Sequence, residues 1–188
     1  MRELISDLFI SLDGFASGVN QPAYFGYFGR DLGGWVRENL AEPQVLLMGR
    51  VTYEAMAGFS ASANDELSAR MRELPKLVFS SKLQEPLVWK NTRVLSGTLA
   101  DEIKALKQEH GDPLRTIGSI SLVKSLMHQG LVDRLRLMVF PLVLGSAGRE
   151  PIFAGYTHTR FELIQTKVLD SRLVLLKYRP RAEPHSVQ

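Results

Sequence analysis

Residues 46–54 read Leu-Leu-Met-Gly-Arg-Val-Thr-Tyr-Glu, a pattern that indicates a buried strand followed by a helix. The apolar run from Val45 to Met48 is typical of a short strand that is buried on both faces. Gly49 ends the run, and we expect a helix to follow over Thr52 to Met56. A strand that delivers a glycine to a helix N-terminus leaves backbone N–H groups free, which suits a phosphate. Arg50 adds a fixed cation, although the stretch also fits a strand, a turn and a helix with Arg50 at the surface.

Strands and helices alternate outward from this stretch as far as Gly130. We expect further strands at Leu4–Leu12, Lys76–Ser80, Thr92–Leu95 and Leu114–Ile117, and helices at Asp31–Leu40, Asp65–Leu74, Leu99–His110 and Ser119–Gln129. After Gly130 only strands are expected, at Leu131–Leu144, Arg160–Val168 and Arg172–Tyr178. This order predicts an α/β fold with a mostly parallel mixed sheet, antiparallel C-terminal strands and helices on both faces.

Length and composition limit the class of protein. The 188 residues are 45% hydrophobic and 23% charged, which fits one globular domain, and we expect it to span residues 1–179 with a frayed tail at 180–188. The net charge of +3 is spread along the chain, so we expect no nucleic-acid partner. The longest apolar run, Leu137–Leu144, is far shorter than the roughly 20 residues of a membrane helix. We therefore expect a cytoplasmic protein with no membrane partner.

Several common catalytic and binding patterns are absent from the sequence. The chain has no cysteine, which excludes disulfides, thiolate nucleophiles and cysteine-ligated metals. The four histidines, at positions 110, 128, 158 and 185, include no pair at i, i+4, and we expect no metal site. Neither the Gly-x-Gly-x-x-Gly fingerprint nor a Walker-type phosphate loop occurs. Any nucleotide site must therefore use other segments.

Two further segments place small polar residues after a predicted strand. Residues 114–122, Leu-Arg-Thr-Ile-Gly-Ser-Ile-Ser-Leu, lead into a helix whose N-terminus suits a second phosphate or the same pyrophosphate. Taken alone, Ser119 also fits an ordinary N-cap. Ser80, Ser81 and Lys82 suit a ribose phosphate, although Ser-Ser-Lys is also common in loops. The carboxyl ends of parallel strands share one edge, where ligands bind in open α/β sheets.

These segments carry a family resemblance. Met48–Glu54 resembles the Gly-Arg-x-Thr-[Trp/Tyr]-Glu element of the dihydrofolate reductase superfamily. Three other stretches resemble its riboflavin-biosynthesis reductase branch: Ser11–Ala16 its Ser-Leu-Asp-Gly opening, Gly118–Leu126 its Gly-Gly-x-x-Leu helix, and Gly130–Gly145 its Gly-Leu-Val-Asp…Pro stretch. They follow the order of the family between Leu4 and Tyr178. The resemblance implies a three-layer sandwich like that of dihydrofolate reductase.

The resemblance also implies a function. It implies NADPH as cofactor and hydride transfer to a small heterocyclic substrate that is pterin-, pyrimidine- or flavin-like. The implied cofactor-binding residues are Gly49, Arg50, Thr52, Ser80, Ser81, Gly118, Ser119, Ile120, Ser121, Leu122 and, near the nicotinamide, Ala16. Asp13 and Asp31 are the candidate catalytic proton donors, and Asp31 also fits a helix N-cap.

The sequence departs from the family pattern in places that bear on the substrate. No arginine lies between Pro75 and the next strand, so the carboxylate clamp of folate enzymes is missing there. Ser119 replaces a second glycine and accepts that backbone readily only at negative φ, so we expect a slightly reshaped phosphate loop. We expect no zinc-deaminase half like that of the bifunctional riboflavin enzymes, because the sequence has no cysteine to bind the zinc. Two alternatives stay open: 5-amino-6-(5-phosphoribosylamino)uracil reductase, and a nucleotide-binding protein without turnover.

Two groups of apolar residues each fit two different structural roles. The resembled branch implies a homodimer paired through its C-terminal strands, and Leu137–Leu144 and Leu173–Leu176 suit either that interface or the core. The aromatic residues before the first helix suit either a stacking wall for a flat ring or the core, and they are Tyr24, Phe25, Tyr27 and Phe28.

Overall fold

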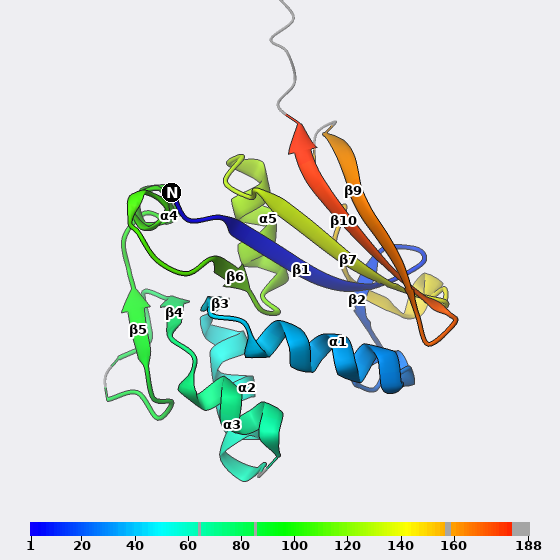
Figure 1. Ribbon diagram of the computed structural model, residues 1–188, viewed down its shortest axis with the longest axis horizontal. Coiled ribbons are helices and arrows are strands. Elements are labelled where there is room, and N and C mark those ends of the chain that lie inside the picture. The colour runs from blue at the N-terminus through cyan, green and yellow to red at the C-terminus, as the bar shows by residue number, and fades with distance from the viewer. Residues whose placement is uncertain (64, 85, 157–158, 182–188) are drawn as a thin grey trace, which may run out of the picture.

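One eight-stranded sheet organises the chain, in the order β5-β4-β3-β6-β1-β7-β10-β9 (Figure 1). The computed structural model describes residues 1–63, 65–84, 86–156 and 159–181. The strands of this sheet are β1 (Leu4–Ser11), β3 (Val45–Gly49), β4 (Lys76–Phe79), β5 (Thr92–Leu95), β6 (Leu114–Thr116), β7 (Arg134–Phe140), β9 (Arg160–Leu169) and β10 (Leu173–Arg181). A second, two-stranded sheet joins β2 (Phe15–Gly18) to β8 (Gly148–Pro151).

The sheet is parallel from β5 to β7 and antiparallel at its C-terminal side. β1 pairs in parallel with β6 and β7, and β3 pairs in parallel with β4 and β6. β10 runs antiparallel to both β7 and β9. Asp170 and Ser171 lie in the three-residue connection between β9 and β10, with positive φ values of 49° and 55°, and the Arg172 N–H donates to the Leu169 carbonyl at 3.1 Å. Positive φ at both central residues is the mark of a primed turn. The mixed sheet expected from the sequence is confirmed.

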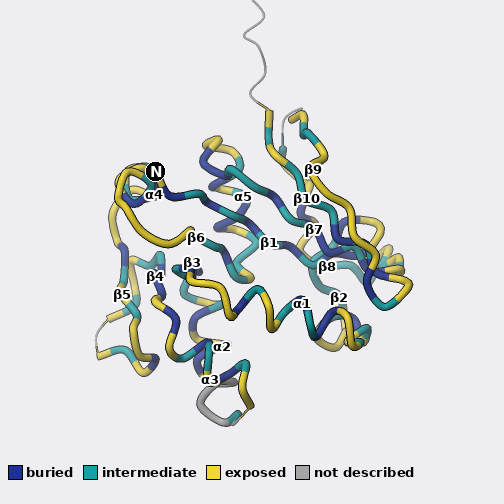
Figure 2. The backbone as a smooth tube through the Cα atoms, in the orientation of Figure 1, coloured by how far each residue is buried: buried dark blue, intermediate teal, exposed yellow. Residues whose placement is uncertain are grey.

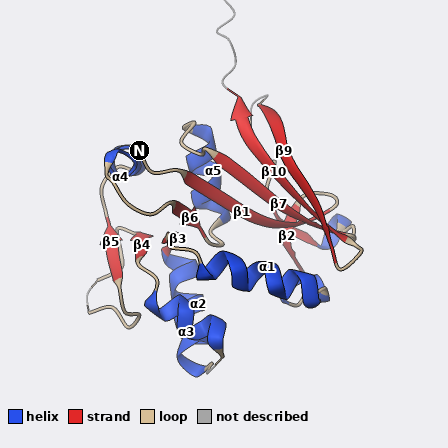
Figure 3. Ribbon diagram, viewed as in Figure 1, coloured by secondary structure: helices blue, strands red, loops and turns tan. Residues whose placement is uncertain are grey.

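Helices cover both faces of the sheet (Figure 3). They are α1 (Arg30–Ala41), α2 (Arg50–Ser62), α3 (Glu66–Glu73), α4 (Leu99–Gln108) and α5 (Ile120–His128), with 3₁₀ turns η1 (Ala23–Gly26) and η2 (Gly145–Ala147). α4 and α5 pack against one face, and α1, α2 and α3 pack against the other. Neighbouring residues of β3 alternate between these cores, with Leu47 in the first and Leu46 in the second. Among the described residues, no helix has both the length and the apolar character needed to cross a membrane.

Several elements differ from the sequence-based expectations. α2 has 13 residues, and β7 is confined to Arg134–Phe140. The short strands β2 and β8 were not expected, since each has four residues with no buried apolar alternation. β10 continues to Arg181, so Pro180 and Arg181 lie in a strand, whereas residues 182–188 of the expected tail lie outside the described residues.

The apolar residues considered for an interface divide into core and surface. In β7 and β10, Met138, Phe140 and Leu173 are buried in a core cluster with α1. The exposed apolar side chains lie instead on β9, where Leu163 and Val168 are 53% and 59% exposed. Figure 2 shows most of β9 in the colour of exposed residues. The edge strand, rather than the strands inside it, therefore offers an apolar surface.

Candidate functional site

A cavity opens where β1 and β6 separate. β6 pairs with β1 only as far as Thr116 opposite Ser6, while β1 continues along β7 to Ser11. The cavity has a volume of about 900 Å³ and lies at the carboxyl edge of the parallel strands. This edge is where open α/β sheets bind their ligands. The opening is large enough for a small ring and part of a cofactor.

Aromatic side chains form one wall of the cavity. Tyr24, Phe25, Phe28 and Trp35 line it, together with Phe9 from β1. The Tyr24 ring lies with its centroid 5.4 Å from that of Phe9 and 5.0 Å from that of Phe28. Burial raises the pKa of the Tyr24 hydroxyl, which therefore stays protonated at neutral pH. A wall of this kind can stack a flat ring.

The aromatic residues before α1 thus take both of the roles that the sequence allowed. Tyr24, Phe25 and Phe28 line the cavity, whereas Tyr27 packs against Phe140 in the core. Tyr24 and Phe25 also have left-handed backbones, with φ of 54° and 50°. Such conformations cost on the order of 1 kcal/mol each and persist only where the surroundings hold them.

Ser119 joins the two predicted phosphate loops. Its hydroxyl accepts a hydrogen bond from the Gly49 N–H at 2.7 Å and donates one to Thr52 Oγ1 at 2.7 Å. Gly118 precedes it with φ of 55°, and a Cβ on Gly118 would lie 3.0 Å from Thr52 Cγ2. The two loops are therefore in close contact, and Gly118 is needed both for its backbone conformation and for the space.

The expectation that Ser119 needs a negative φ is wrong. Its φ is 56°, so it keeps the left-handed conformation that a glycine adopts easily. That conformation costs about 1–2 kcal/mol for a residue with a side chain. Two hydrogen bonds of the hydroxyl, each worth about 1 kcal/mol, offset the cost. The loop is thus preserved by the serine rather than reshaped by it.

Two helix N-termini meet at this junction with no side-chain caps. α2 begins after Gly49 and α5 begins after Ser119, and neither N-cap residue makes a side-chain hydrogen bond to its own helix. The first-turn N–H groups of both helices therefore lack the usual capping acceptor. Free N–H groups and the positive ends of two helix dipoles fit a phosphate or pyrophosphate. These residues therefore fit the phosphates of a dinucleotide cofactor.

The other residues expected at the cofactor are divided between the cavity and its surroundings. Ala16, Thr52, Gly118, Ser119 and Ile120 line the cavity, and Gly49 borders it through Ser119. Arg50 lies on the surface of α2 and pairs with Glu54 at 2.7 Å.

Four more of these residues do not line the cavity. The Ser80 hydroxyl accepts the N–H groups of Lys82 and Leu83 and so holds a turn after β4, and Ser81 is exposed. In α5, Ser121 is exposed, whereas Leu122 is 7% exposed and belongs to the core. The Leu122 side chain therefore packs against the sheet, and only its backbone is near the loop.

Asp13 is held by a turn outside the cavity lining. Its carboxylate accepts hydrogen bonds from the Ser11 hydroxyl at 2.6 Å and from the N–H of Gly145 at 2.8 Å. The Ser11 hydroxyl and the N–H groups of Gly145 and Leu144 hold the pKa of Asp13 below its usual value. A carboxylate in this state gives up its proton well below neutral pH and is a poor acid for catalysis.

Asp31 is also outside the cavity lining. It is an exposed residue in the first turn of α1, and its carboxylate accepts the Asp170 N–H at 3.0 Å. The Asp170 carboxylate in turn accepts the N–H groups of Asp31 and Leu32, at 2.8 and 3.1 Å. The N-cap residue is Gly29, and a Cβ there would lie 2.3 Å from Asp170 Cγ. Asp31 thus anchors α1 to the β9–β10 hairpin.

An ionic cluster that was not expected from the sequence lies at the floor of the cavity. Asp7 and Arg115 line the cavity beside Trp35, and Arg136 lies next to them. A signal was available, because Asp7 is a lone acidic residue inside the apolar strand β1. A charge in such a place needs a partner, and the partners lie more than 100 positions away in the chain.

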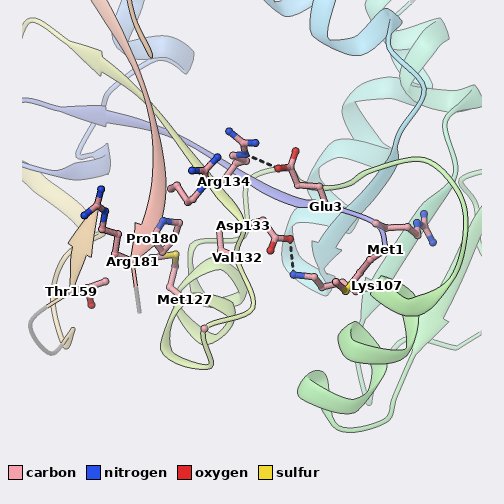
Figure 4. Close-up of a pocket in the computed structure, with 13 residues that line it drawn as sticks. Met1, Glu3, Lys107, Met127, Val132, Asp133, Arg134, Thr159, Pro180 and Arg181 are labelled. Carbon is pink, nitrogen blue, oxygen red and sulfur yellow. Dashed lines mark hydrogen bonds and ion pairs between the residues drawn. The ribbon is translucent and has the colours of Figure 1, made fainter. Parts of the chain in front are cut away.

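A second pocket lies at the opposite edge of the sheet (Figure 4). It has a volume of about 560 Å³ and is lined by charged residues near the start of β1 and the end of β10. Lys107 pairs with Asp133 at 2.6 Å, and Arg134 pairs with Glu3 at 2.6 Å. The other lining cations also have acidic partners, since Arg2 pairs with Glu109 at 3.3 Å, and Arg179 and Arg181 pair with Glu162 at 3.4 and 3.6 Å. Neither a helix N-terminus nor an aromatic ring is among the described residues that line this pocket. The cavity at the carboxyl edge is therefore the candidate site.

The histidines do not gather into a metal site in the described part of the chain. No group of three or more His, Cys, Asp or Glu residues there is arranged to hold a metal ion. His110 is exposed, and both ring nitrogens of His128 lie at backbone carbonyls. His158 and His185 lie outside the described residues.

Comparisons with known proteins agree with this geometry. The profile of the family described as RibD C-terminal domain matches residues 2–175. The chain is 26% identical over 183 residues to the "Uncharacterized protein YyaP" of Bacillus subtilis, a match that covers 94% of each protein.

Solved structures share the fold. A putative riboflavin biosynthesis protein from Shewanella sp. PV-4 is 18% identical with a TM-score of 0.73, covering 96% of this chain and 99% of that one. Dihydrofolate reductase from Enterococcus faecalis, complexed with NADP(H), is 13% identical with a TM-score of 0.62, covering 96% and 97%. The deaminase/5-amino-6-(5-phosphoribosylamino)uracil reductase of Thermotoga maritima is 15% identical with a TM-score of 0.66, and this chain covers 57% of it.

Proposed function

The chain belongs to the RibD C-terminal domain family, and from this premise we propose that it is an NADPH-dependent reductase of a small heterocyclic substrate. The observation that carries the proposal is the junction at Ser119, where two uncapped helix N-termini meet beside a cavity with an aromatic wall. The junction supplies donors for phosphates, and the wall supplies a surface for flat rings. A pterin-, pyrimidine- or flavin-like ring matches such a wall.

The cofactor phosphates are assigned to the two loops. In this proposal, the backbone N–H groups after Gly49 and after Ser119 bind the pyrophosphate, and Thr52 and Ile120 border it. Arg50 reaches the phosphates after leaving Glu54, and the loss is small because an exposed i, i+4 pair contributes only about 0.3–0.5 kcal/mol. Ser80 and Ser81 are assigned to the 2′-phosphate that distinguishes NADPH from NADH. The bound cofactor supplies the hydride.

The chain's own contribution to the reaction is to position the reacting rings. Phe9, Tyr24 and Trp35 form the surface on which the substrate ring stacks. The proton is assigned to a water molecule rather than to Asp13 or Asp31, since neither carboxylate lines the cavity. The protonated Tyr24 hydroxyl is available as a neutral hydrogen-bond donor at the same wall.

Titration with NADPH and, separately, with NADH tests the proposal. The chain has two tryptophans, Trp35 and Trp89, and both line the cavity, so their fluorescence should be quenched when a ligand enters. We expect NADPH to bind at least about tenfold more tightly than NADH, a difference of about 1.4 kcal/mol. A screen of pterins, pyrimidines and flavins for NADPH oxidation follows. If neither dinucleotide binds, the proposal is wrong.

Two other functions each have a supporting observation. The family match favours 5-amino-6-(5-phosphoribosylamino)uracil reductase, and complementation of a strain that lacks this enzyme tests it. The position of Asp13 and Asp31 away from the cavity lining favours a nucleotide-binding protein without turnover. Tight NADPH binding with no oxidation above background across the screen would select that function.

We also propose that the protein is a homodimer paired through its C-terminal strands. The edge strand β9 exposes Leu163 and Val168, and Ile164 is 38% exposed. An apolar edge strand that stays uncovered invites pairing with another chain. A second copy placed against this strand would cover these side chains.

A further inference from the structure

Asp7 is held between two arginines at the floor of the cavity. Arg136 binds it through two atoms, with Nε 2.5 Å from Oδ1 and Nη2 2.7 Å from Oδ2. From the other side, Nε and Nη2 of Arg115 both contact Asp7 Oδ2. The side chains of the three residues are only 10–13% exposed. This is an ion cluster in a largely buried place.

The cluster has one more positive charge than negative charges. Two guanidinium groups share one carboxylate, and in the described part of the chain no further carboxylate pairs with either arginine. The remaining contacts are neutral: Arg115 Nη1 donates to the Asn39 carbonyl and to Gln44 Oε1, both at 3.1 Å, and Arg136 Nη1 donates to Asn39 Oδ1 at 2.6 Å. The Asn39 carbonyl is in the last turn of α1, so the negative end of the helix dipole offsets part of the charge.

The excess charge is partly desolvated. Burial lowers the pKa of Arg115, Asp7 opposes that effect, and Arg136 adds to the lowering. An unbalanced charge in a place shielded from water is costly unless a counter-ion accompanies it. The cluster would therefore gain from an anion that reaches it.

Only one of the two arginines is accessible from the cavity. Arg115 lines the cavity together with Asp7 and Trp35, and Arg136 is not among the lining residues. A guanidinium has five N–H donors, and the contacts above use four of those of Arg115, leaving one Nη2 hydrogen. The Arg115 and Arg136 guanidinium carbons lie 5.8 and 5.2 Å from the centroid of the Trp35 ring. The charge and the aromatic wall thus adjoin each other.

We propose that Arg115 is a specificity-determining residue that pairs with an anionic oxygen, such as a carboxylate, on the flat ring of the substrate. The inference rests on the proposed reductase function and narrows its substrate class to ring compounds that carry such a group. A ring stacked on the aromatic wall beside Trp35 would direct its anionic oxygen to the floor of the cavity, where Arg115 neutralises the charge. Charge-assisted hydrogen bonds of this type are stronger than neutral ones.

The test compares two probes of the same shape and different charge. Calorimetric titration of the protein without cofactor uses 2-naphthoate, which carries a carboxylate, and 2-naphthamide, which is neutral. We expect 2-naphthoate to bind at least about tenfold more tightly, as one buried charge-assisted contact provides. Equal affinities, a preference for the amide, or no binding of 2-naphthoate would overturn the proposal.

Variants then locate the preference. Arg115→Met should reduce the naphthoate preference to less than about twofold, and it should fold, since Asp7 keeps its two-atom contact with Arg136 as a neutral pair. Arg134→Met is the matched control, because it removes the same charge from the opposite edge of the sheet. It should keep the tenfold preference. A preference that survives Arg115→Met would overturn the proposal.

A second variant covers the case in which Arg115→Met does not fold. Arg115→Lys keeps the cation and should keep a reduced preference for 2-naphthoate, whereas a preference unchanged from the wild type would count against Arg115. NADPH titration of the same samples separates this inference from the proposed function. NADPH binding with no naphthoate preference would refute the inference alone, and naphthoate preference with no NADPH binding would refute the reductase alone.

Discussion

The Ser119 hydroxyl accepts the Gly49 N–H at 2.7 Å, although the two residues lie 70 positions apart. The contact fixes the start of α5 against the start of α2 and so sets the distance between the two loops that we propose bind the cofactor phosphates. It depends on a serine in a left-handed conformation. The hydrogen bonds of the Ser119 hydroxyl therefore stabilise the junction, and the left-handed backbone of Ser119 destabilises it.

A pair of substitutions separates the two terms. Ser119→Ala removes both hydrogen bonds and keeps the unfavourable φ, so the free energy of unfolding should fall by about 1–2 kcal/mol. Ser119→Gly removes the same bonds but relieves about 1 kcal/mol of backbone strain, so it should be closer to the wild type. Urea unfolding measures both variants. If the alanine variant is as stable as the glycine variant, the left-handed serine is not strained.

Removing the two carboxylates expected from the sequence should leave the chemical step intact. Asp13→Asn and Asp31→Asn should change the kcat of NADPH oxidation by less than about threefold, compared with the 10²–10⁴-fold effect of a general acid. Both asparagines keep an oxygen that can accept the backbone N–H contacts. The measurement is steady-state kinetics with the substrate found in the screen. A 100-fold loss of kcat in either variant would show that the carboxylate of that residue takes part in the reaction.

The helix cap that Asp170 supplies should be important for stability rather than for the reaction. Asp170→Ala leaves the N–H groups of Asp31 and Leu32 without their acceptor and should cost about 0.5–2 kcal/mol. Asp170→Asn is the matched control, because it retains one acceptor oxygen. Thermal unfolding should rank the wild type above the asparagine variant and the alanine variant last. Equal midpoints for all three would exclude a capping role.

Lys76 should make stability increase with pH in the alkaline range. Its side chain is buried and donates to three carbonyls at the end of α3, and burial lowers its pKa from 10.5 to about 8, with Glu73 opposing the shift. Between these two values the unfolded chain binds more protons than the folded one, so the free energy of unfolding rises with pH. The gain attributable to Lys76 is on the order of 3 kcal/mol between pH 8 and 10.5.

The comparison for Lys76 is the Lys76→Met variant over the same pH range. Subtracting its unfolding free energy from that of the wild type removes the contribution of the other titrating groups. The difference should shift in favour of the wild type as the pH rises from 8 to 10. A difference that is independent of pH would mean that the folded-state pKa of Lys76 is not lowered.

His128 should make the free energy of unfolding decrease as the pH rises through the neutral range, which is the opposite of the effect of Lys76. Its Nδ1 lies 2.8 Å from the Lys124 carbonyl and its Nε2 lies 2.9 Å from the Gly155 carbonyl, so both contacts are satisfied only when both nitrogens carry a proton. The Gly155 and Lys124 carbonyls raise the pKa of His128 above 6.5. Its contribution is therefore complete below pH 6.5 and is lost as the pH rises through the folded-state value.

An NMR titration of the His128 ring, with thermal unfolding at pH 5.5 and pH 8.5, checks this prediction. His128→Gln is the control, since glutamine does not titrate in this range. The wild type should lose stability relative to the variant between the two pH values. A ring that titrates below 6.5 would contradict the arrangement of the two carbonyls.

The proposed homodimer should depend on β9. Val168 is 59% exposed on this strand, and Val168→Lys places a charge in the expected interface. Sedimentation should show a dimer for the wild type and a monomer for the variant. Val51→Lys is the control, because Val51 is 69% exposed on α2 and far along the chain from β9. A wild type that is monomeric at all concentrations would exclude the proposal.

The sequence predicted those parts of the fold and site that depend on local patterns. The buried strand ending at Gly49 and the helix after Ser119 were evident, because a short apolar run, a glycine and a helical period lie next to one another. The position of Gly118 followed from the same reasoning. These residues do come together, and the separation of β1 from β6 leaves the cavity between them.

The features of the site that the sequence did not predict depend on contacts between residues that are distant in the chain. Nothing near Asp31 indicates that Asp170 supplies its cap, and Asp31 therefore looked available for catalysis. The ion pairs of Asp7 form only when β6 and β7 place Arg115 and Arg136 on either side of it. The φ of Ser119 was also misjudged, because its two hydrogen-bond partners belong to the other loop.

The hydrogen bonds between Asp170 and α1 delay the folding of this helix during synthesis of the chain. A ribosome releases α1 early, yet the carboxylate that caps this helix lies 139 positions later. Until the final hairpin has emerged, α1 has an incomplete N-terminus and no partner for its buried face in β10. The nascent chain must therefore carry an unfinished cavity wall until β10 has been made. Chaperone dependence of this protein should accordingly be greatest just before β10 is made.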